Sequence, residues 1–424
     1  MNRRLSRELG LGGATFVGLG SILGTGVFVS LGIAAGVTGP SVVLAVGLAA
    51  LVATANALSS AQLAAAHPVS GGTYEYGYRF LNPAAGFAAG WMFLFAKSAS
   101  AATAALGLGG YLLSLVAPTA PVWSHTAVAV AAVALLTAVV AAGLRRTTPV
   151  NVVIVSITVI SLLAFVAISL PFIDLGRYVP FFAPEPGRTE VGALLYAAAL
   201  SFVAYTGYGR IATLGEEVKE PRRTIPRAVI TTISITMLLY LLVAAAGVGT
   251  LGSAGMALMT EETGAPLEVA AGSLIGTPGR ITLALGAVTA MAGVLLNLIL
   301  GLSRVLLAMG RRGDMPKLYA SVRESTPLPA VLTMGIVIAA VTLVGDVRLT
   351  WSFSAVTVLL YYALTNGAAL LLSMDQRLYP RWISVFGLFG CLSLAVFVDV
   401  AVLAVAAGVL AVGFVWFLLR SRRR

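Results

Sequence analysis

Two glycine-rich segments interrupt two strongly apolar stretches of this chain. The first spans residues 20–28 and reads Gly-Ser-Ile-Leu-Gly-Thr-Gly-Val-Phe; the second spans residues 202–210 and reads Phe-Val-Ala-Tyr-Thr-Gly-Tyr-Gly-Arg. A helix that crosses lipid keeps its backbone hydrogen bonds internal, because lipid offers no partners. A break at membrane depth is tolerated only where the freed groups face protein, water or a ligand. A matched pair of breaks in two halves of a chain points to the binding site of a secondary transporter.

The composition places both segments inside a membrane protein. Of the 424 residues, 59% are hydrophobic and only 10% are charged, with a mean hydropathy of +0.97, whereas a soluble domain is about 25% charged. The basic N-terminus runs into an apolar segment without a cleavage site, so we expect no cleavable signal peptide. A single cysteine, Cys391, excludes an intrachain disulfide. Neither His67 nor His125 has metal-ligand spacing, so we expect no metal site and no cofactor.

The net charge of +11 reflects where the basic residues stand. Arginine and lysine gather at both termini, at Arg145 and Arg146, and in residues 215–227, 311–327 and 374–381. The connections that alternate with these carry few. This is the positive-inside pattern, and it favours contact with anionic lipid headgroups rather than nucleic acid. We therefore expect a multi-pass protein of the cell membrane with both termini in the cytoplasm and membrane lipids as neighbours.

About twelve apolar segments are long enough to cross a bilayer, which takes about 20 residues per helix. They are residues 10–36, 40–66, 84–116, 122–143, 149–171, 191–214, 226–250, 280–310, 328–344, 348–373, 382–397 and 400–419. The pattern predicts an all-α polytopic membrane protein in a single integral domain. Residues 10–171 and 191–373 hold five spans each and each open with a broken helix. Their topologies must then be opposite, which is a five-plus-five inverted repeat, and residues 382–419 add two helices.

One external connection, residues 252–279, is unusually long. It contains Glu261, Glu262, Pro266 and Glu268. The segment is long enough for a short amphipathic helix. Such a helix could act as a lid over the outer end, and a plain surface loop is the alternative.

Four motifs resemble those of the amino acid–polyamine–organocation permeases. Residues 20–28 resemble the first-helix signature G-x-x-I-G-[ST]-G-I-F, and residues 62–74, followed by Gly90-Trp91, resemble E-L-x-x-x-x-P-x-x-G-G-x-Y. Residues 216–228 are similar to E-E-x-x-N-P-x-R-x-I-P-R-A, and residues 303–316 to the end of the eighth helix. The matches run from residue 10 to about residue 330 in the family's order. The resemblance implies the five-plus-five fold and transport of amino acids or related amines.

The chain departs from the family pattern at three places. Gln62 stands where the family often has glutamate, and Gly209 stands where many members have an acid in the sixth helix. Proton-coupled relatives often carry a lysine in the fifth helix, but residues 151–165 contain none. The coupling ion, a proton or sodium, therefore stays open.

The first break offers groups for both ends of an amino acid. The N-terminus of its outer half-helix has free N–H groups and partial positive charge, which suit a carboxylate. Gly24, Thr25 and Gly26 would supply these N–H groups, and glycine allows close approach. Ser21 and Ile22 would supply carbonyls for the ammonium. The alternative is that the glycines only serve helix packing.

The second break offers a matching set. Phe202, Ala204 and Tyr205 could present carbonyls at the end of the inner half-helix, and Gly207 lies in the break itself. The rings of Phe202, Tyr205 and Tyr208 could cap the ligand and act as a gate. Ordinary buried aromatic packing is the alternative for each ring.

Two cations stand at membrane depth, Lys97 and Arg210. An intramembrane charge is costly and indicates function by default. Desolvation favours the neutral form of a buried lysine, so Lys97 could carry a proton, could attract a substrate carboxylate, or could snorkel near a helix end. Arg210 keeps its charge and could be a counter-charge for an anionic substrate, a gate partner or a ligand of backbone carbonyls. Both charges disfavour a cationic substrate.

Glu216 and Glu217 follow the second break, beside Lys219, Arg222 and Arg223. They could form a cytoplasmic charge network that latches an inner gate. A solvated loop is the alternative.

These features favour a secondary transporter of amino acids, preferably neutral ones, that works by alternating access with proton coupling or exchange. The alternatives are a non-transporting sensor or partner subunit with the same fold, an organic amine or polyamine antiporter, and a channel. The chain lacks a P-loop motif and a Ser-His-Asp constellation, so we expect neither an ATP-driven pump nor an enzyme. A monomer and a homodimer both remain open.

Overall fold

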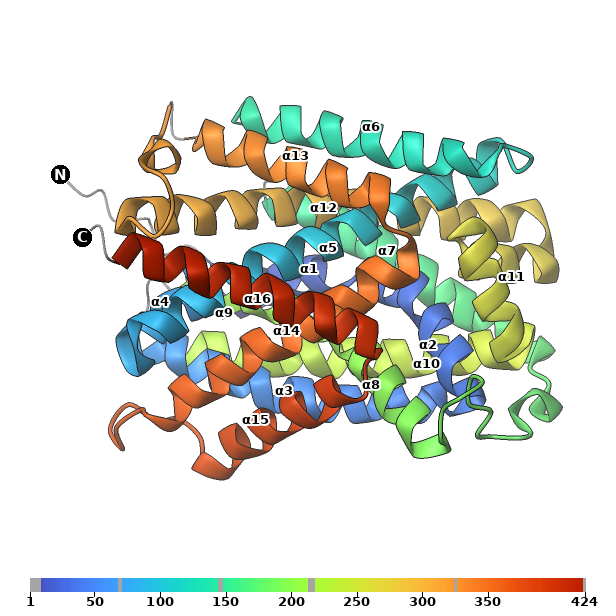
Figure 1. Ribbon diagram of the computed structural model, residues 1–424. Helices are drawn as coiled ribbons and strands as arrows, with labels where there is room; N and C mark the ends of the chain where they lie inside the picture. Colours follow the sequence, from blue (N-terminus) through green and yellow to red (C-terminus); the bar gives the residue numbers. More distant parts are fainter. Residues whose placement is uncertain (1–8, 68–70, 144–147, 213–217, 324–325, 422–424) are drawn as a thin grey trace.

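The computed structural model describes residues 9–67, 71–143, 148–212, 218–323 and 326–421. Within these residues the regular secondary structure is helical, and β-pairing is limited to isolated bridges. The helices run roughly side by side in one bundle (Figure 1). The all-α polytopic architecture predicted from the apolar segments is confirmed.

The helix bounds follow the predicted spans closely. The helices are α1 (Leu11–Ile22), α2 (Leu31–Thr38), α3 (Val42–Ala66), α4 (Thr73–Tyr76), α5 (Pro83–Val116), α6 (Val122–Ala141), α7 (Thr148–Ser169), α8 (Glu190–Tyr205), α9 (Gly209–Ala212), α10 (Pro221–Thr263), α11 (Pro266–Ile275), α12 (Thr277–Arg312), α13 (Leu328–Val344), α14 (Val347–Leu370), α15 (Arg381–Val396) and α16 (Val400–Ser421). Within the described residues, nine segments are long and apolar enough to cross a membrane, and α13 and α15 are shorter apolar helices.

Both glycine-rich segments break their helices. The helix α1 ends at Ile22, Leu23 is extended with ψ of 112°, and a π-helical turn over Gly26–Ser30 leads into α2. The helix α8 ends at Tyr205 and passes through a 3₁₀ turn over Thr206–Tyr208 into α9. The interruptions predicted inside the first and sixth spans are therefore present.

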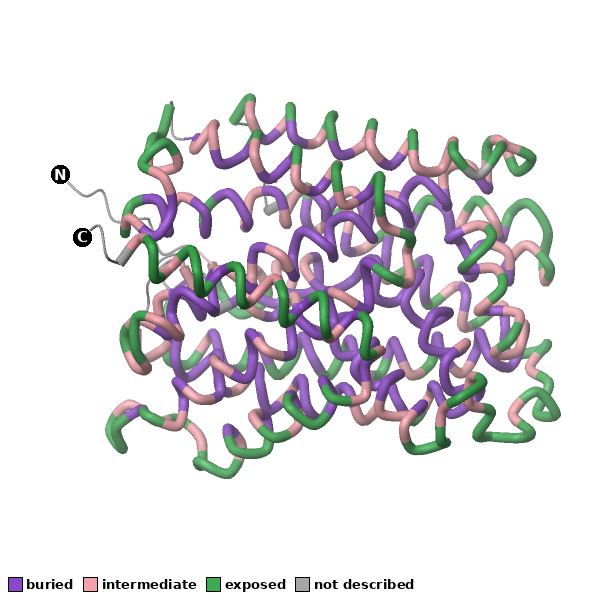
Figure 2. The backbone as a smooth tube through the Cα atoms, viewed as in Figure 1, coloured by how far each residue is buried: buried purple, intermediate pink, exposed green. Residues whose placement is uncertain are grey.

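Burial separates an inner group of helices from an outer one. Figure 2 shows buried residues concentrated along α3, α5 and α8, whereas α16 is exposed along much of its length. The exposed side chains of α6, α7 and α16 are largely apolar, including Leu135, Ile160 and Val412. Exposed apolar surface of this kind on a bundle of spanning helices is the surface that contacts lipid.

The bundle has two ends, which we name by the short helices found there. The α4 end is the left-hand end in Figure 1, where α16 also finishes, and the α11 end is the right-hand one. Residues 252–279 lie at the α11 end and are more helical than predicted. The helix α10 continues to Thr263 across a kink at Gly252, whose φ is 74°, and α11 follows. Glycine adopts this φ without strain, and with a ψ of 161° the backbone at Gly252 is not helical, so α10 consists of two helical segments that meet at this kink.

Candidate functional site

A cavity of about 890 Å³ reaches from the two broken helices to the α4 end. Its inner wall comes from the breaks and from α5 and α14, and its outer wall comes from α4 and the last turns of α12. Its lining residues include Ser21, Ile22, Thr25, Gly26, Glu75, Lys97, Ser100, Ala204, Thr206, Gly207, Arg210, Val294, Asn297, Leu298, Gly301, Arg304, Arg311, Arg312, Trp351 and Tyr362. The cavity therefore connects both breaks with one end of the bundle.

The first break lies in the cavity wall. Ser21, Ile22, Thr25 and Gly26 line the cavity, whereas Gly24 packs against Val294 of α12. The hydroxyl of Thr25 is buried and makes no hydrogen bond with any of the described residues. A buried hydroxyl without a partner is costly. A ligand in the cavity would supply the missing partner, and the N-terminal end of the half-helix that starts at Gly26 would supply donors to it.

The second break contributes fewer of the predicted residues. Ala204 and Gly207 line the cavity, and so does Thr206 between them. The rings of Phe202 and Tyr208 pack against Tyr362 instead, with centroids 5.9 Å and 5.4 Å away. These aromatic side chains are completely buried behind the wall, so here they support the break rather than face the cavity.

One tyrosine of α10, which does not line the cavity, bridges two of the predicted carbonyl acceptors. The hydroxyl of Tyr240 lies 3.0 Å from the carbonyl oxygen of Ile22 and 3.3 Å from that of Ala204. The ring of Tyr205 packs against that of Tyr240 in a tilted arrangement with centroids 5.2 Å apart, and its hydroxyl donates to the carbonyl of Val46 at 3.3 Å. A carbonyl oxygen has two lone pairs, so each bridged carbonyl can still accept a second hydrogen bond from the cavity side. The sequence around Tyr240 gave no indication that its hydroxyl would bridge the two breaks.

Lys97 lies in the cavity wall near the middle of α5. Its side chain is only 8% exposed, and its Nζ donates a hydrogen bond of 2.9 Å to the hydroxyl of Thr206. Among the described residues no carboxylate lies within ion-pair distance of this ammonium group. This placement does not fit a lysine that snorkels to the membrane surface. It puts a charge-bearing group in direct contact with the second break.

Arg210 and three further arginines line the part of the cavity nearest the α4 end. Arg304 and Arg311 stand on one face of α12, together with Asn297 and Gly301, at helical spacing. Sequence reasoning did not single out this face, although its spacing of 297, 301, 304 and 311 inside an apolar helix was a usable signal. The positive character expected from Lys97 and Arg210 therefore extends along the whole cavity.

Arg312 stands beside an acidic partner. Its guanidinium pairs with Glu75 of the α4 segment and lies over the ring of Tyr78, 4.1 Å from the centroid. Tyr74 and Tyr78 each donate a hydrogen bond of 2.7 Å to the buried carboxylate of Asp314. These contacts fasten α4 to the last turn of α12 at the cavity mouth.

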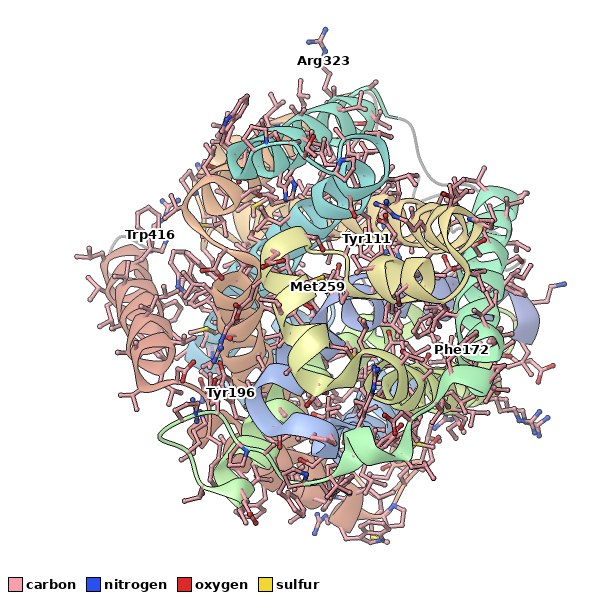
Figure 3. All side chains as sticks on the ribbon, turned by 90° about the vertical axis from the view of Figure 1, so that its right-hand side faces the viewer. Tyr111, Phe172, Tyr196, Met259, Arg323 and Trp416 are labelled. Atoms are coloured by element: carbon pink, nitrogen blue, oxygen red, sulfur yellow. The ribbon has the colours of Figure 1, made fainter. Side chains whose placement is uncertain are left out.

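The α11 end is closed above the breaks. Tyr111 lies near the middle of this end in Figure 3, and its hydroxyl donates a hydrogen bond of 2.8 Å to the carbonyl of Phe28. Glu268 of α11 is completely buried and pairs with Arg280 at 3.0 Å. Further out, Arg188 joins Glu185 to Asp399. The cavity lining contains none of these residues, so the cavity has its mouth at the α4 end.

Two predicted gating residues, Glu216 and Glu217, lie outside the described residues. Elsewhere in the described chain, no group of three or more histidine, cysteine or carboxylate side chains is arranged to hold a metal ion. The hydroxyl of Thr289 on α12 donates to carbonyls of its own helix at 2.7 Å and 3.2 Å, so it is turned away from the cavity.

Comparison with known proteins shows the family to which this chain belongs. The family model described as amino acid permease matches residues 13–422. An uncharacterized transporter of Mycobacterium tuberculosis is 40% identical and covers 96% of this chain and 90% of its own length. The branched-chain amino acid permease BcaP of Bacillus subtilis is 28% identical over 78% of this chain and 73% of its own. Cationic amino acid transporter 9 of Arabidopsis thaliana is 29% identical over 76% of this chain and 58% of its own. Broken apolar helices around a central cavity and a match along almost the whole chain agree: this integral membrane protein belongs to the amino acid permease family.

Proposed function

We propose that the protein is a secondary active transporter of neutral amino acids that works by alternating access. Family membership supports amino acid transport. The observation that carries the finer proposal is the cavity, which joins both helix breaks to the α4 end and whose lining includes neither Tyr111 nor the Glu268–Arg280 pair of the α11 end. A site at the closed end of a one-sided cavity is what one half of an alternating-access cycle requires.

The breaks supply one partner for each charged end of an amino acid. The substrate carboxylate would accept hydrogen bonds at Thr25 and Gly26, where the outer half-helix begins and where the Thr25 hydroxyl has no partner among the described residues. The ammonium group would donate to carbonyls around Ser21 and Ala204. This arrangement binds the part that all amino acids share and leaves the side chain to the rest of the wall.

The remaining wall favours an uncharged side chain. Val294, Leu298 and Trp351 provide apolar surface, and Ser100 and Asn297 provide neutral polar groups. Lys97 and Arg210 line the same cavity, so a lysine or arginine side chain would meet like charge. The same argument disfavours a polyamine antiporter.

Coupling to protons or to exchange of a second amino acid fits the wall better than coupling to sodium. Lys97 is the candidate proton carrier, because a desolvated ammonium group without a carboxylate partner can lose its proton. Sodium would need several oxygen ligands, and the hydroxyl of Thr289 is turned to its own helix.

The proposed topology follows from the positive-inside pattern. The α4 end would face the cytoplasm, both termini would lie there, and the cavity would be open to the inside of the cell. Residues 10–171 and 191–373 would form the inverted repeats, and residues 382–419 the additional helices.

Uptake by purified protein in proteoliposomes tests the proposal. Each of the twenty amino acids is offered in turn under a pH gradient, under a sodium gradient, and with unlabelled amino acid inside the vesicles. We expect saturable, concentrative uptake of neutral amino acids, with L-leucine as the first probe because BcaP is named for branched-chain substrates. Ligand binding without uptake would indicate a sensor, and uptake that does not saturate would indicate a channel.

A further inference from the structure

The contact between Lys97 and Thr206 joins a long unbroken helix to a helix break. Lys97 belongs to α5, which runs from Pro83 to Val116, and Thr206 is the first residue after α8 ends. The Nζ of Lys97 donates to the Oγ1 of Thr206 at 2.9 Å. Within the part of the chain that the structure describes, this is the only hydrogen bond of the Lys97 ammonium group, so its charge acts there on one hydroxyl of the second break.

Thr206 is held at both its side chain and its backbone. Its hydroxyl donates to the carbonyl of Val203 at 2.8 Å, and its carbonyl accepts from the hydroxyl of Tyr362 at 3.1 Å. The hydroxyl therefore accepts from Lys97 while it donates into the last turn of α8. A change in the charge of Lys97 therefore acts directly on Thr206, the residue that follows the end of α8.

The second break is in direct contact with the first. A β-carbon at Gly207 would lie 2.2 Å from the carbonyl oxygen of Ser21, and a β-carbon at Gly26 would lie 2.4 Å from the β-carbon of Ala204. The two breaks thus lie in close contact at two points. A shift of Thr206 towards the first break would carry Gly207 against Ser21.

We propose that Thr206 is the positioning residue through which the proton on Lys97 controls the geometry of the substrate site. A hydrogen bond from a charged donor is roughly twice as strong as one from a neutral donor. The protonated ammonium group fastens Thr206 to α5 and keeps both breaks in the arrangement seen here. Loss of the proton weakens this link and frees the breaks to rearrange. The inference rests on the proposed amino acid transport and names the regulation of that same site.

Other charged groups share the cavity with Lys97 and must be distinguished from it. The titratable and charged side chains on the surrounding elements are Glu75 of α4, Arg210 of α9, Arg304, Arg311 and Arg312 of α12, and Tyr361 and Tyr362 of α14. Glu75 pairs with Arg312 at the mouth, and arginine keeps its proton. Lys97 is therefore the group whose loss of charge would act at the breaks.

A double-mutant cycle on L-leucine binding tests the inference at one fixed pH. The proteins are wild type, Lys97→Gln, Thr206→Val and the double variant. Thr206→Ser keeps the hydroxyl and serves as the conservative variant. Thr103→Val is the matched control, because it removes a different α5 hydroxyl contact, 2.8 Å from Thr350, outside the cavity lining. Thermal midpoints without ligand verify that each variant is folded.

We expect each single change at Lys97 or Thr206 to weaken L-leucine binding roughly tenfold or more, since each removes the same charge-assisted hydrogen bond. The double variant should be no weaker than the weaker single one, and Thr206→Ser and Thr103→Val should stay near wild type. In proteoliposomes Thr206→Val should flatten the pH profile of uptake as Lys97→Gln does, and Thr206→Ser should restore it.

Additive losses in the double variant would overturn the inference, and so would a wild-type pH profile in Thr206→Val beside a flat one in Lys97→Gln. Either result leaves the transport proposal standing. Wild-type uptake that does not change with pH would contradict both this inference and proton coupling. An absence of any amino acid uptake by wild type would contradict the proposed function itself.

Discussion

Gly207 lies against the backbone of Ser21, so closely that a β-carbon at Gly207 would sit 2.2 Å from the Ser21 carbonyl oxygen and 2.6 Å from the Ile22 nitrogen. The two residues come from breaks almost two hundred positions apart in the chain. Only glycine allows this approach, because any other residue would place its side chain inside the neighbouring backbone. The substrate site proposed here therefore depends on two broken helices that fix each other.

Gly207→Ala should separate the breaks and impair L-leucine binding. The methyl group meets backbone atoms of Ser21 and Ile22 that cannot turn away as a flexible side chain could. We expect a loss of binding of roughly tenfold or more, in line with a clash costing about 1–3 kcal/mol. Ligand-induced thermal stabilisation of the purified protein measures the effect.

Gly47→Ala is the matched control, because a β-carbon there would meet its nearest neighbour only at 4.0 Å, a side-chain methyl group of Leu241. This variant should bind L-leucine as wild type does. Equal ligand stabilisation of Gly207→Ala and Gly47→Ala would show that the contact between the breaks does not shape the site.

Arg210→Ala should relax discrimination against cationic amino acids. Two unit charges about 6 Å apart at an effective dielectric of about 20 repel by about 3 kcal/mol, or roughly a hundredfold in affinity. Competition by L-lysine and L-arginine against L-leucine uptake measures the change, with wild type as reference. New competition supports the electrostatic reading. Loss of all uptake by folded protein would assign Arg210 to a gate, and an unchanged profile would refute its role in selectivity.

Glu268 should make the stability of the α11 end depend on pH. Burial raises the pKa of Glu268 above its ordinary value of 4.5, against the opposing effects of Arg280 and Ser114. The folded protein therefore holds this proton at a pH where the unfolded chain has lost it. This contribution to stability is complete below the unfolded pKa and is lost as pH rises through the folded pKa.

The thermal midpoint of wild type should accordingly fall more steeply than that of Glu268→Gln as pH rises from 4.5 towards neutrality. Glutamine cannot ionise but keeps an oxygen acceptor for Arg280 and Ser114. Unfolding in detergent, followed by intrinsic fluorescence at a series of pH values, gives both curves. Parallel curves would show that Glu268 does not titrate differently in the folded protein.

The sequence predicted the helices well because lipid imposes one simple rule on them. Apolar length alone placed spans such as 84–116, which the structure shows as Pro83–Val116. The span predicted for residues 226–250 ends beside the kink at Gly252, and the short helix considered for residues 252–279 is present as α11; what hydropathy did not show is that a second helical segment runs from the kink to Thr263. Hydropathy does not distinguish a kinked helix from a helix followed by a loop.

From the sequence we could predict only those features of the site that depend on the backbone, namely the positions of the two breaks. Glycine spacing located both breaks, but which way a ring turns depends on packing between distant helices. Phe202 and Tyr208 therefore proved to face Tyr362. The partner of Lys97 was equally hidden, because Thr206 stands 109 positions away in the chain and reaches it only through the fold.

Gly26 illustrates the same limit. From the sequence we expected glycine at this position to let a ligand approach the free N–H groups closely. In the structure a β-carbon at Gly26 points at Ala204, 2.4 Å away, so Gly26→Val would push the breaks apart. Loss of ligand stabilisation is still the expected result, and normal stabilisation would argue against a carboxylate site at this break.

Gly301 offers the most direct test that the cavity is the transport pathway. It lines the cavity on α12, and no atom lies within 4 Å of a β-carbon placed there. Gly301→Ala should fold well, since alanine stabilises a helix interior by up to about 1 kcal/mol relative to glycine, whereas Gly301→Phe should fill the space that a substrate must cross.

The decisive measurement is concentrative L-leucine uptake into proteoliposomes by wild type, Gly301→Ala and Gly301→Phe, with equal thermal midpoints as proof of folding. We expect saturable uptake by wild type and Gly301→Ala and none by Gly301→Phe. Uptake by folded Gly301→Phe at the wild-type rate would show that the cavity is not the transport pathway.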